Sequence, residues 1–424
     1  MAHQPTIAIP LDLPDVEVRS TTVTKDRTVV IEVESTLATT TCRRCGQTIS
    51  QSHGHDRLLT LRHLPMLGMP VFIRIRPKRF RCPFCDDHPT TTQRLAWYEP
   101  NATATTAFVK HLLLQLIHST IADVVLKEGV TEDTVRGILA HWVETTIDWD
   151  RLPVFHIIGI DEIALKKGHR DFVALITAQT PDGELHLLAV LPDRKKETVV
   201  AWLRKLPAAR KVAITRVCTD MWEGYVSAVE EVLPAALVVI DRFHVAQHYH
   251  KAADTLRKAE LKRLKAVRPK TVMDTLKHTM WPFRKRKQDL TPDEAAALRR
   301  LLEQSPDLLR AYELREGLRA IFETATSKRV GVRRINAWMK RVRASGLDCY
   351  TSVIKLLERW LDYIANYFHE RQTSGFVEGL NNKIKVLKRR CFGIINPTSL
   401  FQRMTLDMHG YRRFGRSGLV PVPK

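Results

Sequence analysis

The sequence predicts an α/β core that is interrupted by an all-helical insertion and preceded by a small β-rich domain and a pair of helices. Three observations support this fold class. Residues 154–245 alternate apolar, strand-like runs with helical stretches, residues 248–368 have an almost entirely helical pattern, and the first 100 residues combine strand-like alternation with two cysteine pairs. The 424 residues are enough for about two to four domains with at least one sizeable core.

The charge of the chain favours a polyanionic partner. Lys and Arg number 67 against 46 Asp and Glu, which gives a formal net charge of +21. The basic residues are unevenly placed, because ten Lys or Arg follow Glu378 with Asp407 as the one acidic residue among them. We expect such a tail to lie along a phosphate backbone, which would make binding strongly dependent on salt. A basic but inert solvated surface is the alternative.

Two properties of the sequence bear on its compartment. No stretch approaches the roughly 18 apolar residues that a membrane-spanning helix needs. The N-terminus has no charged region followed by an apolar block, the pattern of a secretory signal. We therefore expect a cytoplasmic protein that is associated with the nucleoid if its source is bacterial.

Four of the seven cysteines form two pairs, Cys42 with Cys45 and Cys82 with Cys85, each with two residues between its members. This spacing and the odd total suit metal binding in a reducing compartment better than disulfides. Four thiolates predict a structural Zn²⁺ site with no open coordination position, whereas paired free thiols are the alternative. Lone histidines in such loops are more often surface groups, but four of them could replace a ligand: His53, His55, His63 and His88.

A helix-turn-helix is predicted between residues 105 and 149. Residues 108–117 have one apolar face, and residues 120–127 form a second short helical stretch. Gly129 lies in the turn that follows, and Thr131 is suited to cap a helix that extends to Trp142. Such a pair could place its second helix in a major groove. A helical hairpin that serves only packing has the same pattern.

Five strands are predicted in residues 154–245, at 154–160, 171–178, 184–190, 212–219 and 236–240, with helices at 197–206 and 221–233. The turn at 180–183 (TPDG) joins the second strand to the third as a hairpin. Three antiparallel strands followed by two strands with crossover helices is the order of a ribonuclease H-like domain. That order puts Asp161 in the central strand and Asp220 at the end of its neighbour.

Three acidic residues stand out by their positions. Asp161 and Asp220 each end an apolar run, and Glu378 lies in a basic helical stretch near the C-terminus. Two carboxylates at strand ends and one on a helix can share Mg²⁺, and a pair of such ions can activate a water or a 3′-hydroxyl for phosphodiester exchange. This is nuclease or transposase chemistry. In the alternative, the aspartates cap strand ends and Glu378 forms a salt bridge with Lys383 or Lys385.

Four motifs follow one another in the order GIDE (159–162), TDM (219–221), DRFH (241–244) and GFVEGLNNK (375–383). With these motifs the chain resembles the DDE transposases of bacterial insertion sequences, most closely the ISL3 group, over nearly its whole length. Each motif is weak alone, but their joint order is specific. The resemblance implies five segments: a zinc-binding domain (1–100), a helix-turn-helix DNA-binding domain (101–150), the ribonuclease H-like core (151–250), a helical insertion (251–370), and the last core helix with a basic tail (371–424).

The resemblance also implies roles for single residues. Asp161, Asp220 and Glu378 would be the catalytic triad that binds Mg²⁺ or Mn²⁺. His244 matches a position that lies near the scissile phosphate in related transposases, so it would position DNA as a catalytic residue, or else orient Asp241. Glu162 follows Asp161 on the strand and should point to the opposite face, where its role would be structural. Asn381 and Asn382 follow Glu378 by about one helical turn, so one of them could face the same site or contact DNA.

The function that these expectations describe is transposition. The enzyme would bind the terminal inverted repeats of its insertion sequence, cut by attack of water, and join ends to target DNA by attack of a 3′-hydroxyl. A homodimer is expected, because two double-stranded DNA ends must be held together. The alternatives are a non-catalytic DNA-binding regulator derived from such an enzyme and a metal-dependent DNA nuclease with the same core.

Overall fold

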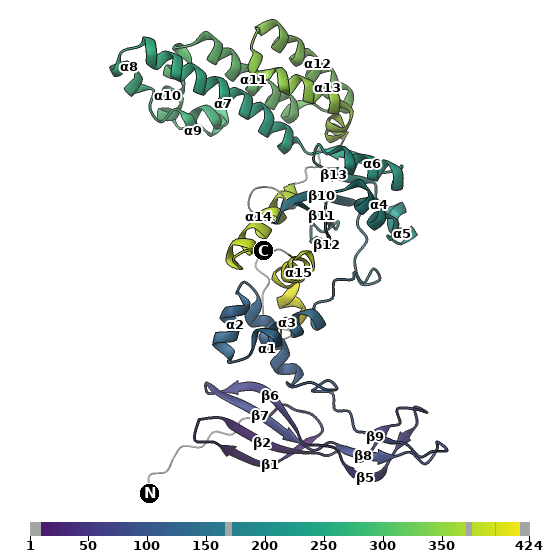
Figure 1. Ribbon diagram of the computed structural model, residues 1–424. Helices are drawn as coiled ribbons and strands as arrows, with labels where there is room; N and C mark the ends of the chain where they lie inside the picture. Colours follow the sequence, from purple (N-terminus) through teal and green to yellow (C-terminus); the bar gives the residue numbers. More distant parts are fainter. Residues whose placement is uncertain (1–9, 166–171, 370–374, 395, 416–424) are drawn as a thin grey trace. The chain divides into compact units, whose positions relative to one another are not determined.

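The computed structural model describes residues 10–165, 172–369, 375–394 and 396–415 (Figure 1). The chain divides into two compact units. The first comprises Met1–Glu144 with Gln402–Lys424, and the second comprises Thr145–Phe401. Among the described residues, no helix combines the length and the apolar character that crossing a membrane requires.

The N-terminal part of the first unit consists of three small sheets. The largest has four strands in the order β1 (Val16–Val23), β2 (Val29–Ser35), β7 (Met69–Ile75) and β6 (Leu59–Met66), and its second and third strands are parallel. Strand β2 buries alternate residues, Val29, Ile31 and Val33, because successive side chains of a strand point to opposite faces. The smaller sheets are β3 (Thr40–Thr41) with β4 (Thr48–Ile49), and β5 (Gln51–His55) with β8 (Lys78–Arg81) and β9 (Thr90–Thr92).

Three helices follow the sheets in the first unit: α1 (Thr106–Leu116), α2 (Ile121–Glu128) and α3 (Glu132–Trp142). Helix α2 begins with a capping box in which Thr120 and Asp123 each satisfy a backbone N–H group of the other. It ends at Gly129, whose φ of 62° lies in the left-handed region, and Thr131 caps α3 by accepting a hydrogen bond from the Thr134 N–H. The predicted helices and their turn are therefore confirmed.

The second half of helix α15 (Pro397–Phe414) also belongs to the first unit. Its Leu406 is buried with the apolar side chains of α1–α3, and Gln402 Nε2 donates to the carbonyl of Val143 at 3.0 Å. Arg403 Nη2 donates to the carbonyl of Ser119 at 2.6 Å. Residues 371–424 were expected to provide the last core helix and a basic tail; of these, the described residues from Gln402 onward pack on the apolar side chains of the three-helix domain.

The second unit contains a five-stranded sheet in the order β12 (Leu185–Leu191), β11 (Phe172–Gln179), β10 (Ile157–Ala164), β13 (Arg216–Thr219) and β14 (Leu237–Ile240). Strands β10 to β12 are antiparallel neighbours, whereas β13 pairs in parallel with both β10 and β14. The predicted hairpin turn is present, since the N–H of Gly183 donates to the carbonyl of Thr180 at 2.9 Å. Asp161 thus lies on the central strand, as the order of predicted elements required.

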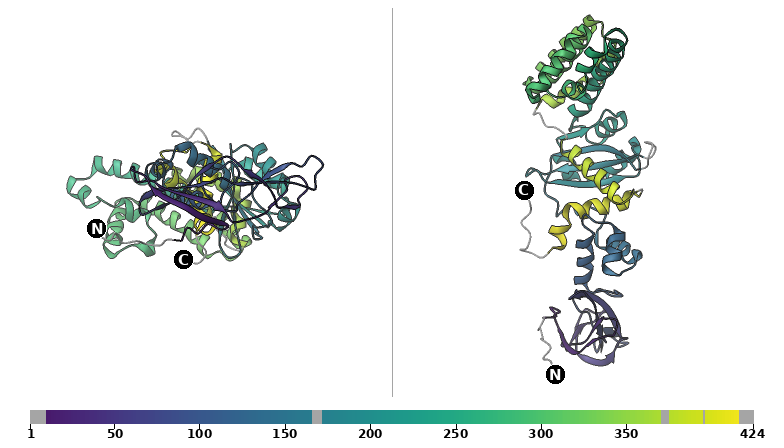
Figure 2. Two further views of the ribbon diagram at one scale, coloured as in Figure 1. Left: turned by 90° about the horizontal axis from the view of Figure 1, so that it is seen from below. Right: turned by 90° about the vertical axis from the view of Figure 1, so that its left-hand side faces the viewer.

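Helices cover both faces of this sheet. Figure 1 shows α4 (Lys196–Arg204) and α6 (Glu223–Val232) on one side, while α14 (Gly375–Arg390) lies beside β10 on the other, a placement that Figure 2 also shows. One predicted strand starts too early: residues 208–213 form helix α5 (Ala208–Ala213), so Val212 is helical and β13 begins at Arg216. Pro207 fits the start of a helix, and the Ala, Arg and Lys residues that follow favour one.

The helical stretch after β14 is confirmed. It comprises α7 (Arg242–Val267), α8 (Lys270–Thr275), α9 (Met280–Arg284), α10 (Pro292–Glu303), α11 (Pro306–Thr324), α12 (Lys328–Ser345) and α13 (Thr351–Ala365), with short 3₁₀ turns at Lys287–Asp289, Asp348–Tyr350 and Asn366–His369. The end of the stretch returns to the sheet, because Asn366 is buried and its Nδ2 donates to the carbonyl of Val238 in β14 at 2.6 Å. The insertion is therefore tied to the sheet at both of its ends.

Candidate metal centres and nucleic-acid interface

The four paired cysteines come together in the first unit. Their sulfur atoms all lie within 4.8 Å of one another, and Cys82 Sγ is 3.6 Å from both Cys45 Sγ and Cys85 Sγ. A tetrahedral zinc with Zn–S bonds of about 2.3 Å places its sulfurs about 3.8 Å apart, so this cluster fits a structural Zn²⁺ ion. The histidines named as possible substitutes are not part of the cluster. One of them, His63, is buried with its Nδ1 2.9 Å from Thr105 Oγ1.

Two hairpin turns hold these cysteines in place. Cys42 follows β3, and its N–H donates to the carbonyl of Gln47 at 2.8 Å, while Cys82 follows β8 and donates to the carbonyl of Pro89 at 3.0 Å. The backbone N–H groups of Cys45 and Arg44 lower the pKa of the Cys42 thiol to about 6, which favours the thiolate that a metal binds. Burial instead raises the pKa of the Cys82 and Cys85 thiols, so among these three cysteines the backbone favours the thiolate only at Cys42.

Three aspartates stand in one row across adjacent parallel strands of the second unit. Ile160 of β10 is in register with Thr219 of β13, and Thr219 is in register with Ile240 of β14. The residues that come next along the three strands are Asp161, Asp220 and Asp241. All three are more than half buried, with Asp161 only 9% and Asp241 only 5% exposed. The fold therefore concentrates carboxylates at one edge of the sheet.

The charge of this row is incompletely compensated. Burial, followed by the nearby carboxylates of Asp161 and Glu162, raises the pKa of Asp220 to about 7, while Arg194 opposes them. Burial also raises the pKa of Asp161, against a hydrogen bond from the N–H of Glu162 and the positive charge that His244 can carry. A bound cation would offset the cost of ionising these carboxyl groups, because it would stabilise the same ionised oxygens.

Unsatisfied oxygens support that reading of the site. Among the described residues, Oδ1 of Asp220 and Oδ1 of Asn381 are buried and have no hydrogen-bond partner. Buried polar atoms are normally paired, so an orphaned carboxylate oxygen calls for an ion, a water or a ligand. An oxygen-rich pocket of this kind fits Mg²⁺ or Mn²⁺, which take carboxylate and amide oxygens.

Helix α14 contributes to the row through Asn381. Its Nδ2 donates to Oδ2 of Asp161 at 2.5 Å, and the ammonium of Lys388 donates to the carbonyl of Ala164 at the end of β10. Glu378 belongs to the first turn of the same helix, but its side chain lies outside the described residues. The structure therefore brings Asp161, Asp220 and Asn381 together, and leaves the third expected carboxylate as a prediction.

His244 and Asp241 lie at the start of the helical insertion. Asp241 caps α7, because its Oδ1 accepts a hydrogen bond from the N–H of Phe243 at 2.9 Å. The cap gives Asp241 a structural role of its own, and it leaves open both roles considered for His244. His244 lies one turn further on and is close enough to Asp161 for its charge to lower the pKa of that carboxyl.

Three neighbours of the carboxylates carried no recognisable signal in the sequence. Arg194 pairs with Glu162 at 2.8 Å and lies over the ring of Trp222 at 4.3 Å. The hydroxyl of Tyr225 is buried without a hydrogen-bond partner, and its pKa is raised by burial and then by Asp220. Arg194 comes from the loop before α4, Trp222 directly precedes α6 and Tyr225 lies in its first turn, so only the folded chain shows that they meet.

Comparisons with known proteins define the class to which the fold and its two sites belong. A family model described as a transposase matches residues 158–404, and one described as the zinc-finger of transposases IS204/IS1001/IS1096/IS1165 matches residues 38–85. The chain is 25% identical over 394 residues to the transposase for insertion sequence element IS1001 of Bordetella parapertussis, covering 91% of this chain and 93% of that one. It is 26% identical over 393 residues to the transposase for insertion sequence element IS1557 of Mycobacterium tuberculosis, covering 87% and 86%.

The class is thus that of the transposases. Because the first model covers more than half of the chain, the chain belongs to the ISL3 family of transposases, with the family's zinc finger at its N-terminal end. DNA binding follows from membership of this family. The cysteine cluster, which fits a structural zinc, lies within the residues that the zinc-finger model matches, and the transposase model matches most of the mixed α/β body with its many helices.

Proposed function

We propose that this transposase is a DDE-type enzyme whose catalytic residues are Asp161, Asp220 and Glu378. The observation that carries the proposal is the adjacency of Asp161 and Asp220, two buried carboxylates whose pKa values are both raised. Glu378 lies three positions before Asn381, which is the spacing of one helical turn, and Asn381 binds Asp161. The strand order of the sheet supports a ribonuclease H-like core as the scaffold of this site.

The cofactor in this proposal is Mg²⁺ or Mn²⁺. Asp161, Asp220 and Glu378 would hold it, and when bound it would make a water or a 3′-hydroxyl a better nucleophile and stabilise the oxygen that leaves. The residues of the chain prepare the site in three ways. Asn381 fixes the orientation of Asp161, the burial of Asp220 limits access of water, and the ion pair of Arg194 with Glu162 keeps a third carboxylate from adding its full charge.

His244 is proposed to contact the phosphate that is cut. It lies one turn into α7, and its charge acts on Asp161, so a phosphodiester at the carboxylate row would be within its reach. A protonated imidazole would attract the phosphate, and a neutral one could still donate a hydrogen bond. Asp241 has a separate role in this proposal, since it caps the helix that carries His244.

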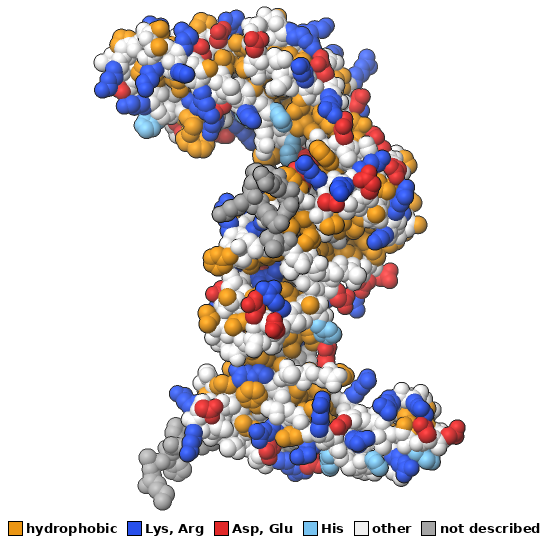
Figure 3. All heavy atoms as spheres, in the orientation of Figure 1, with side chains coloured by type: hydrophobic (Ala, Val, Ile, Leu, Met, Phe, Trp, Pro, Cys, Tyr) orange, Lys and Arg blue, Asp and Glu red, His pale blue; other side chains and the backbone are white. Residues whose placement is uncertain are grey.

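The DNA substrate is proposed to be the terminal inverted repeats of the element, together with target DNA. The zinc finger and the helix-turn-helix would recognise the repeats, and α3 would be the helix that enters the groove. The first turn of α3 carries Glu132 and Asp133, while Arg136 pairs with Glu132, so Arg136 would have to exchange that partner for DNA. Lys and Arg side chains are spread over the visible face of the helical insertion and would hold flanking DNA (Figure 3).

A homodimer acting on the nucleoid in the cytoplasm completes the proposal, because two ends must be cut and joined together.

A cleavage assay tests the proposed catalytic residues. Wild-type protein should nick terminal-repeat DNA with Mg²⁺ or Mn²⁺, whereas Asp161→Asn, Asp220→Asn and Glu378→Gln should bind the DNA without nicking it. Unchanged nicking in these variants would refute the triad. Nicking of branched DNA without repeats, and without joining, would instead indicate a nuclease, and binding without nicking by wild type a regulator.

A further inference from the structure

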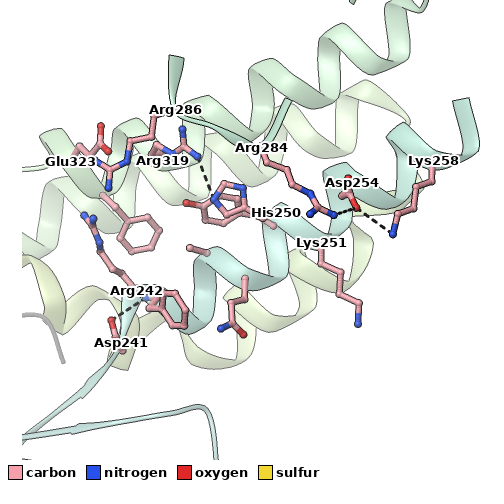
Figure 4. Close-up of a pocket in the computed structure, with 15 residues that line it drawn as sticks. Asp241, Arg242, His250, Lys251, Asp254, Lys258, Arg284, Arg286, Arg319 and Glu323 are labelled. Atoms are coloured by element: carbon pink, nitrogen blue, oxygen red, sulfur yellow. Dashed lines mark hydrogen bonds and ion pairs between the residues drawn. The ribbon is translucent and has the colours of Figure 1, made fainter. Parts of the chain in front are cut away.

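A cavity of about 790 Å³ lies where the helical insertion leaves the sheet. Its volume is within the range of roughly 300–1,000 Å³ that is typical of ligand pockets. Six Lys or Arg residues and three acidic residues line it, so its lining is basic. Figure 4 shows that Arg242, from the first turn of α7, faces Arg319 of α11 and Arg286 across the cavity. An anionic ligand would be attracted to this lining.

Most charges in the cavity have partners that fix them in place. Asp254 is buried and accepts from Arg284 Nη2 at 2.7 Å, which with Arg257 holds the pKa of Asp254 at about 2 against the opposing effect of burial. Arg319 pairs with Glu316 at 2.8 Å. In contrast, Arg242 and Lys251 have no carboxylate partner among the described residues. Within the part of the chain that the structure describes, Arg242 Nη1 donates to the hydroxyl of Tyr367, at 3.3 Å. These two cations are therefore available to a ligand.

One stripe of α7 gives the cavity a more specific character. Phe243, Gln247 and Lys251 follow one another at intervals of four residues, so they share one face of the helix, and all three are exposed and line the cavity. Phe243 is a large apolar side chain that is 39% exposed although it lies beside buried residues. An aromatic ring, an amide and an ammonium in sequence offer stacking, hydrogen bonds to a base edge and a contact to a phosphate.

The cavity also adjoins the row of aspartates. Asp241, which follows β14 in register with Asp161 and Asp220, is one of its lining residues, and Phe243 is two positions beyond it. The ring of Phe243 is 5.9 Å from that of His244. A DNA strand whose phosphate reached the row would therefore pass the mouth of the cavity within about a nucleotide or two.

We propose that this cavity receives one unstacked nucleotide of the DNA strand that is cut, with Phe243 stacking on its base, Gln247 contacting the base edge, and Arg242 and Lys251 binding its phosphates. The proposal rests on the proposed function, because it places the nucleotide next to the proposed cleavage site. It accounts for a basic cavity with an exposed aromatic ring at a position where a purely structural helix end would bury or omit that ring. A base taken out of a duplex costs a few kcal/mol of lost stacking and pairing, which the cavity must repay.

The test measures DNA binding without cleavage, and it depends on the free-energy cost of taking a base out of the duplex. Binding of the full chain to terminal-repeat duplexes is measured without divalent ions, with a single mismatch as the lesion, moved along the duplex. Because a mismatched nucleotide is already partly unpaired, wild-type protein should bind about tenfold more tightly when the lesion is at the extruded position. Phe243→Ala should lose this gain and Phe243→Trp should keep it. Phe392→Ala is the matched control, since Phe392 is 95% exposed and lies outside the cavity lining.

The outcomes separate this proposal from the catalytic one. Lys251→Ala should weaken binding to matched and mismatched DNA equally and reduce the salt dependence of binding by about one phosphate contact. If no position gives a gain that depends on Phe243, or if Phe392→Ala abolishes it as well, the cavity does not take a nucleotide. A Phe243-dependent gain together with unchanged nicking in Asp161→Asn would keep the cavity and refute the triad. Melting curves of each variant establish that it is folded.

Discussion

Asn381 Nδ2 donates a hydrogen bond to Oδ2 of Asp161 at 2.5 Å, although 220 positions separate the two residues. The bond joins the helix that follows the insertion to the central strand of the sheet. It fixes Oδ2 of Asp161, while Oδ1 accepts a hydrogen bond from the N–H of Glu162 at 2.7 Å, so both carboxylate oxygens are held in a defined orientation. Groups that orient metal-binding carboxylates in this way typically change metal affinity or activity by about 10–100-fold when they are removed.

The first prediction follows from that bond. Asn381→Ala should lower the rate of DNA nicking by about 10–100-fold, because Asp161 would lose the group that orients it. Asn382→Ala is the control, since Asn382 is its exposed neighbour on the same helix. The rates are compared at saturating and at limiting Mn²⁺, and the defect should be larger at limiting Mn²⁺. Equal rates for the two variants at every Mn²⁺ concentration would show that the bond has no such role.

The second prediction concerns pH. Burial and the carboxylates of Asp161 and Glu162 hold the pKa of Asp220 at about 7, well above the ordinary 3.8, so the folded state binds the proton more tightly than the unfolded state does. The resulting stability is fully present below about pH 4 and is lost as the pH rises through 7. The free energy of unfolding of metal-free protein should therefore fall by up to a few kcal/mol over this interval.

Asp220→Asn should remove most of that dependence, because an amide does not titrate. Mg²⁺ should also reduce the fall in the free energy of unfolding of wild-type protein above pH 7, since a bound cation would stabilise the ionised carboxylate in the folded state. Denaturant unfolding at a series of pH values, with and without Mg²⁺, measures both effects. A wild-type curve that matches the Asp220→Asn curve throughout would contradict the assignment of the raised pKa.

The third prediction concerns zinc. Metal analysis should find about one Zn²⁺ per chain, and Cys82→Ser should lose it, because Cys82 is buried and lies 3.6 Å from two other ligands. Loss of the metal should unfold the cysteine-bearing hairpins while the carboxylate site remains formed. Cys391→Ser, outside the cluster, should retain the zinc. Protease sensitivity between residues 38 and 85 reports the unfolding, and a zinc-free region that resists protease equally well would overturn the prediction.

The fourth prediction concerns the junction of the insertion and the sheet. Asn366→Ala should destabilise the protein by about 1–3 kcal/mol, because it removes the hydrogen bonds that the Asn366 side chain makes with the carbonyl of Val238 and the ammonium of Lys328. Asn336→Ala, on α12, should change the free energy of unfolding by no more than about 0.5 kcal/mol. Urea unfolding of both variants provides the comparison. Equal stabilities would mean that the junction is held by apolar packing alone.

The sequence predicted the elements of the core well, because their signals are local. Apolar runs that end in Asp161 and Asp220 indicated strands, and their order placed Asp161 at the centre of the sheet, as found. The early start assigned to β13 was wrong because Val212 and Ala213 continue an apolar pattern that a short helix also satisfies. Periodicity alone does not separate a short helix from a strand.

The surroundings of the site were less predictable. Asn381 could be considered because it lies one helical turn from Glu378, but nothing in the sequence links Arg194 or Tyr225 to the carboxylates. Glu162 was expected on the opposite face, and its ion pair with Arg194 supports a structural role, yet its charge still raises the pKa of Asp220. Its charge acts on Asp220 because charges in a buried environment are poorly screened.

The most direct test of the central claim is the position of bound Mn²⁺, located by its anomalous scattering in crystals of the protein with terminal-repeat DNA. The account predicts ions at about 2.0–2.3 Å from carboxylate oxygens of Asp161 and Asp220, with Glu378 as a further ligand, and loss of these ions in Asp161→Asn crystals. Mn²⁺ bound elsewhere, with Asp161 and Asp220 both without an ion at high Mn²⁺ concentration, would contradict it.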